Sequence, residues 1–74
     1  MLQSTAIKFN DDYVVFWKVE DVPSIPGTYS LTIVSRQFVK DKWQDSKNEI
    51  FLDTDKLQMI CSLFDGVRND LNKL

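Results

Sequence analysis

Apolar and polar residues alternate through the first half of the chain, which is the pattern expected of β-strands. Residues 13–19 are dense in β-branched and aromatic side chains and predict a strand whose two faces are both largely apolar. A shorter strand is expected over residues 6–9, followed by turn-forming residues at 10–12. Residues 20–27 predict a loop, in which residues 25–28 (Ile-Pro-Gly-Thr) have the composition of a tight turn.

The longest alternating segment covers residues 29–42. The side chains expected on one face are Leu31, Ile33, Ser35, Gln37 and Val39, and those expected on the other are Thr32, Val34, Arg36, Phe38 and Lys40. Polar residues take over near Ser35, as in a strand that leaves the core and continues as a curved ribbon. The sequence then predicts a turn at residues 45–48 and a short apolar strand at residues 50–52.

A helix is predicted from Asp53 to Leu74, with Asp53 as its N-cap and an acidic first turn that favours the helix dipole. The apolar residues at helical spacing are Leu57, Ile60, Cys61, Phe64, Val67, Leu71 and Leu74. Met59 and Leu63 widen this stripe beyond what one thin sheet covers, so we expect them at a dimer interface.

These elements predict one small α+β domain over residues 1–74, in which a curved antiparallel sheet of about four strands packs on one long C-terminal helix. A chain of 74 residues buries only roughly 60% of the surface that its unfolded form exposes. Its single cysteine excludes an intrachain disulfide, and the absence of histidine argues against a metal site or any other cofactor. A homodimer is therefore the expected additional source of stability.

Neither the start of the chain nor its apolar segments indicate a membrane protein. Residues 1–5 carry no basic segment followed by an apolar run, and no apolar stretch reaches the roughly 20 residues of a membrane helix. Together with the free thiol, this favours a cytoplasmic protein without a membrane partner.

The sequence does not indicate an enzyme. Without histidine, the usual general base near neutral pH and the catalytic triads built on it are absent. Cys61 falls on the apolar stripe and is expected to be a small buried hydrophobic residue and not a nucleophile. The carboxylate pairs lie in predicted turns and at the helix start, where structural or solubility roles are expected.

Cations and rings alternate in one part of the chain, at Arg36, Phe38, Lys40, Lys42 and Trp43. Rings of this kind stack nucleobases, and neighbouring cations bind phosphates. The alternative is a solvated sheet edge, where Lys and Arg discourage pairing with another strand. The net charge of −2 and the interleaved Asp41 and Asp45 oppose phosphate binding.

Residues 44–57, which read QDSKNEIFLDTDKL, resemble part of the single-stranded-DNA-binding domains related to transcriptional positive cofactor four and the Whirly proteins. The resemblance covers about residues 29–70. It implies strands followed by one C-terminal helix, dimerisation through that helix, and binding of single strands on a curved surface of strands. The contact residues that it implies are Arg36, Phe38, Lys40, Lys42 and Trp43, with Lys47 in the hairpin. The chain differs from the family in having Glu49 where a glycine usually precedes the final strand, and in lacking a basic N-terminal arm.

Two functions follow as hypotheses. The first is a dimeric module that binds single-stranded nucleic acid, DNA or RNA, in transcription or replication. The second is a small acidic protein-interaction or inhibitor domain of phage or mobile-element origin. Salt distinguishes them, because phosphate binding weakens steeply as salt rises while an apolar protein interface responds weakly.

Overall fold

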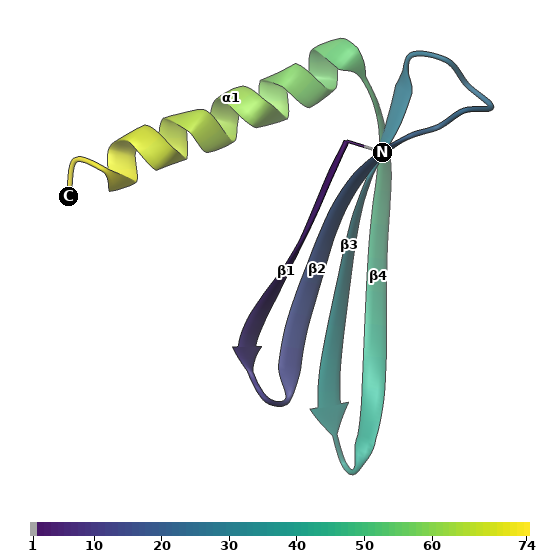
Figure 1. The fold of residues 1–74 in the computed structure, drawn as a ribbon, viewed down its shortest axis with the longest axis vertical. Coiled ribbons are helices and arrows are strands. Elements are labelled where there is room, and N and C mark those ends of the chain that lie inside the picture. The colour runs from purple at the N-terminus through teal and green to yellow at the C-terminus, as the bar shows by residue number, and fades with distance from the viewer. Residues whose placement is uncertain (1) are drawn as a thin grey trace.

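In the computed structural model, which describes residues 2–74, four antiparallel strands precede one helix (Figure 1). The elements are β1 (Gln3–Asn10), β2 (Tyr13–Asp21), β3 (Thr28–Val39), β4 (Lys42–Asp53) and α1 (Thr54–Leu71). The strands pair in chain order, β1-β2-β3-β4. The predicted α+β fold, with its antiparallel sheet and C-terminal helix, is confirmed.

Two of the three strand connections lie where the sequence places them. Between β1 and β2, the backbone N–H of Asp12 donates a hydrogen bond to Asn10 Oδ1 at 2.8 Å, which closes the expected turn. Between β2 and β3, the N–H of Thr28 bonds the carbonyl of Ile25 at 3.1 Å, and Gly27 adopts φ of 81°. The tight turn predicted at residues 25–28 is thus present, and its second-position proline and positive-φ third-position glycine make it type II.

The third connection is not where the sequence predicts it. β3 and β4 are joined by Lys40 and Asp41, with φ of 52° and 63°, and residues 45–48 lie inside β4. Positive φ at both central residues is the requirement of a type I′ hairpin turn. This turn pairs all twelve residues of β3 with β4, whereas a turn at 45–48 would leave the first half of β3 paired on the β2 side alone. Ladder hydrogen bonds therefore outweigh the turn-like composition of residues 45–48.

Helix α1 begins directly at the end of β4. Asp53 is the predicted N-cap: its Oδ1 accepts a hydrogen bond from the backbone N–H of Lys56 at 2.9 Å. The Lys56 ammonium lies 2.9 Å from Asp53 Oδ2. These interactions, the side-chain hydrogen bond from Lys56 first, lower the pKa of Asp53 below its usual value.

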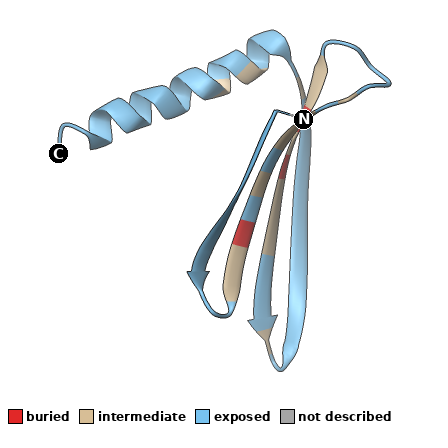
Figure 2. Cartoon of the chain, viewed as in Figure 1, coloured by how far each residue is buried: buried red, intermediate tan, exposed pale blue. Residues whose placement is uncertain are grey.

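Within one chain α1 does not pack on the sheet, contrary to expectation. Because α1 begins at the residue after β4 ends, no loop turns the helix back across the sheet. No helix residue is buried, and Figure 2 shows most of the chain as exposed. Among residues 2–74, Val15 is the only buried hydrophobic side chain, and Cys61, expected in the core, is exposed.

The sheet and the helix extend from one corner as two arms (Figure 1). The molecule measures 42 × 42 × 15 Å, and its radius of gyration is 15.1 Å. A compact domain of this length has a radius of gyration of about 11 Å. The strands and the helix are therefore formed, but they do not pack together into a compact domain.

Candidate nucleic-acid interface

The strand register sorts the side chains of the sheet into two faces, because directly opposed residues of antiparallel strands point to the same side. On the side of α1 lie Trp17, Val19 and Leu31, which line a groove beneath the helix. The opposite face, called here the basic-aromatic face, carries Phe16, Lys18, Thr32, Val34, Arg36, Phe38, Trp43 and Lys47. Four of the six predicted contact residues thus share one face: Arg36, Phe38, Trp43 and Lys47.

The hairpin end of the basic-aromatic face holds a preformed cluster of rings and a cation. Phe38 and Trp43 are opposed across β3 and β4, with ring centroids 5.2 Å apart and planes inclined at 51°. The Arg36 guanidinium lies 5.5 Å from the centroid of the Trp43 ring, a cation–π distance. Phe38 and Trp43 remain 38% and 47% exposed, so both rings are accessible to a further flat group.

Asp45 sits among these cations and forms an ion pair with one of them. Its carboxylate lies 3.3 Å from Arg36 Nε, directly across the strand pair. Both side chains are more than half exposed, so the pair contributes little to stability. The ion pair instead orients the Arg36 side chain, because it holds the guanidinium beside the Trp43 ring. It also offsets part of the positive charge that a phosphate would meet.

The other predicted contact residues are dispersed. Lys40 lies in the hairpin turn, and Lys42, opposite Val39, belongs by strand alternation to the face on the side of α1. Lys47 lies opposite Val34 on the basic-aromatic face. Within residues 2–74, none of these three lysines forms an ion pair. Their charges are therefore available to an anion, although from different sides of the sheet.

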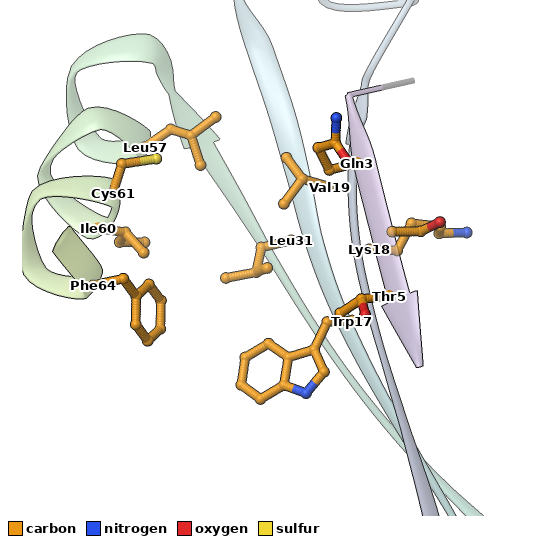
Figure 3. Close-up of a pocket in the computed structure, with 11 residues that line it drawn as sticks. Gln3, Thr5, Trp17, Lys18, Val19, Leu31, Leu57, Ile60, Cys61 and Phe64 are labelled. Atoms are coloured by element: carbon orange, nitrogen blue, oxygen red, sulfur yellow. The ribbon is translucent and has the colours of Figure 1, made fainter. Parts of the chain in front are cut away.

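A second candidate surface, the apolar groove, lies between the sheet and the base of the helix (Figure 3). Its volume is about 270 Å³. Figure 3 shows Leu31 and Trp17 directed from the sheet toward the helix residues Ile60 and Phe64. The remaining lining residues are Gln3, Ser4, Thr5, Lys18, Val19, Leu57 and Cys61. The groove is open to solvent because the helix faces the sheet across it without contact along most of its length.

The predicted dimer residues lie outside the groove, on the flank of the helix. Met59 is 71% exposed and Leu63 is 61% exposed. Farther along, Phe64, Val67 and Leu71 are also exposed. The sequence stripe also identifies Ile60 and Phe64, but it does not reveal that Trp17 and Leu31 face these two residues across an open groove. That juxtaposition depends on the angle between helix and sheet.

Comparison of the chain with family models, curated proteins and solved structures gives no match. In the part of the chain that the structure describes, no three carboxylate or thiol side chains come close enough together to hold a metal ion. Over residues 2–74, α1 is the only helix, and it is not apolar enough to cross a membrane. The candidate surfaces are thus the basic-aromatic face and the apolar groove.

Proposed function

We propose that this protein binds single-stranded nucleic acid on the basic-aromatic face and acts as a homodimer, with a role in transcription or replication. The observation that carries the proposal is the cluster at the hairpin end. Two accessible rings lie 5.2 Å apart, with a guanidinium 5.5 Å from one of them. Each unpaired base has a flat π face, so it can stack on such rings whatever its identity.

The same arrangement favours a single strand over a duplex. Rings can stack only on bases that are unpaired and unstacked, as they are in single strands, loops and ends. The cations are few and the net charge is −2, so phosphate attraction alone would give weak binding. Stacking must then supply much of the affinity. Arg36 and Lys47 would contact phosphates along the strand, and Lys40 would do so from the turn.

The homodimer is supported by the surface that one chain leaves uncovered. A compact monomer of this mass exposes about 4,700 Å², whereas this chain exposes 6095 Å². If each of two copies covered the excess of about 1,400 Å², the dimer would bury about 2,800 Å², within the range of obligate homodimers. Residues 2–74 include one buried hydrophobic side chain, too few for a core, so folding and association would be coupled.

Geometry indicates which part of the chain a second copy would cover. The 18 residues of α1 span about 27 Å, while four strands span about 14 Å from the first axis to the last. A helix that crossed the strands at a right angle would therefore overhang its own sheet. The overhanging part carries Val67 and Leu71, which match the apolar groove of another copy in chemical character. If the end of each helix lay in the groove of the other copy, the two contacts would be identical, as a two-fold dimer requires.

The alternative function, an acidic protein-interaction domain, is favoured by one observation. The apolar groove and the helix flank form an uncovered apolar surface, and large patches of this kind mark protein-binding sites. A different protein in the groove would leave the chain monomeric when purified alone. A second copy would make it dimeric.

The proposed function is tested by titrating a fluorescently labelled oligothymidylate with the purified protein at low and at moderate salt. We expect binding that weakens as salt rises, because phosphate contacts release counterions. Trp43→Ala should lose about 1–3 kcal/mol of binding free energy with an unchanged salt slope, because stacking releases no counterions. No measurable affinity for the wild-type protein at low salt would refute the nucleic-acid function and leave the protein-interaction domain.

A further inference from the structure

Besides the apolar groove on the side of α1, the sheet has a hollow on its basic-aromatic face, away from the hairpin. It has a volume of about 320 Å³ and is lined by Phe16, Lys18, Thr32, Val34 and Lys47 from three neighbouring strands. Phe16 is 43% exposed, so its ring is accessible from the hollow. Val34 forms part of the floor, because both Phe16 and Lys47 lie directly opposite it. The hollow thus offers one ring, an apolar floor and two cations.

The charges around the hollow leave one cation available. Lys18 pairs with Glu20 at 3.4 Å, and the Thr32 hydroxyl donates a hydrogen bond to Glu49 Oε2 at 3.4 Å. Lys47 has no ion-pair partner among residues 2–74. Going along β4 from the hairpin on this face, Lys47 is thus the last cation before the carboxylate of Glu49. Coming from the hairpin, an anionic strand would meet the Arg36–Asp45 ion pair, then the attraction of Lys47, and then the repulsion of Glu49.

We infer that this hollow is a second nucleotide subsite, in which Phe16 stacks an unpaired base and Lys47 contacts its phosphate. The inference rests on the proposed function, since it extends the same strand along the same face. Val34 and Phe38 are four residues apart on β3, about 13 Å at the rise of a strand. Stacked bases are about 3.4 Å apart, so one nucleotide cannot occupy both places. The bound strand therefore spans several nucleotides, from Trp43 at the hairpin to Phe16 on β2.

The dependence of affinity on oligonucleotide length tests the subsite. Oligothymidylates of about four and about twelve nucleotides bracket the footprint of a single-strand site. Phe16→Ala should weaken binding of the longer oligonucleotide about 5- to 100-fold and leave the affinity for the shorter one unchanged. Phe38→Ala should weaken both, because the shorter strand occupies the hairpin cluster. Since Phe16 is already partly exposed, its truncation should keep the fold, which a circular dichroism spectrum checks.

Charge variants provide an independent readout. Lys47→Gln should weaken binding of the longer oligonucleotide and reduce its salt slope by about one, whereas Lys73→Gln near the C-terminus should change neither. Glu49→Gln should tighten binding of the longer oligonucleotide only. If wild-type protein binds both lengths but Phe16→Ala and Lys47→Gln bind the longer one as wild type does, the subsite is refuted and the hairpin site stands. If wild-type protein binds neither, both proposals fail together.

Discussion

At the scale of single residues, orientation decides which of the charged groups can act together. Arg36 is held beside Trp43 by the ion pair with Asp45, so the guanidinium, the ring and the carboxylate form one unit. Removing Asp45 would free a charge for phosphate but would also release the guanidinium from its place. Lys40, Lys42 and Lys47 have no ion-pair partner within residues 2–74, and their contribution depends on the side of the sheet from which they project.

Lys47 and Lys42 provide a matched pair for the proposed binding face. Both belong to β4 and carry the same charge, but strand alternation places them on opposite faces. Lys47→Ala should weaken oligonucleotide binding and lower the salt slope by about one, because it removes a phosphate contact. Lys42→Ala should change binding less. Anisotropy titrations over a series of salt concentrations measure both, and equal losses for the two variants would contradict the assignment of the site to one face.

At the scale of elements, the β3–β4 hairpin combines a favourable ladder with an unfavourable turn. Twelve residue pairs, among them Phe38 opposite Trp43, favour this register. The turn itself places Lys40 and Asp41 in the left-handed region, which costs roughly 1–2 kcal/mol for each residue with a side chain. The pairing of a long strand therefore imposes a turn that the local sequence does not favour.

Removing the backbone strain at this turn should raise the stability of the fold. Asp41→Gly should stabilise the fold by about 1 kcal/mol, because glycine adopts the I′ conformation without steric cost. For a domain of this size the melting temperature should rise by about 4–8 °C. Asp11→Gly in the β1–β2 turn is the matched control: its φ is not positive, so glycine there should give no gain. A melting temperature that is unchanged or lower in Asp41→Gly would argue against a type I′ turn with positive φ at residue 41.

At the scale of the whole molecule, the two arms leave the apolar groove and the end of the helix without cover. The open shape is a direct consequence of joining α1 to β4 with no loop. Burying an apolar side chain contributes roughly 1.5–3 kcal/mol, and this chain forgoes that gain for most of its large side chains. A second copy would restore this gain, because it would place an apolar helix end against each groove.

Dimerisation should be lost when a charge is placed on the helix flank. Leu63→Glu should give monomers or unfolded chains in sedimentation experiments, because the carboxylate would be buried against apolar surface. Ser62→Glu, one residue away on the polar side of the helix, adds the same charge and should remain dimeric. Cys61 gives a second readout, since alkylation of its thiol should be slow in the dimer and faster in Leu63→Glu. A folded, dimeric Leu63→Glu protein would exclude this interface.

The sequence by itself determined the elements that depend on local patterns. Alternation of side chains identified β1, β2, β3 and the two faces of β3, but only residues 50–52 of β4. Pro26 and Gly27 identified a tight turn, and Asp53 identified the start of the helix. Each is a local property, because a strand alternates every second residue and a cap bonds an amide three residues away. The rings and cations at Arg36, Phe38 and Trp43 were recognised for the same reason.

Only the tertiary structure decided what depends on partners distant in the chain. It moved the last hairpin turn from residues 45–48 to Lys40 and Asp41, because the number of ladder pairs outweighs turn composition. It separated Lys42 from Lys47, and it added Phe16 to the basic-aromatic face through pairing of β2 with β3. It also left α1 apart from the sheet. A wide apolar stripe shows that a helix needs cover, but the angle at which the helix leaves β4 decides whether its own sheet can provide it.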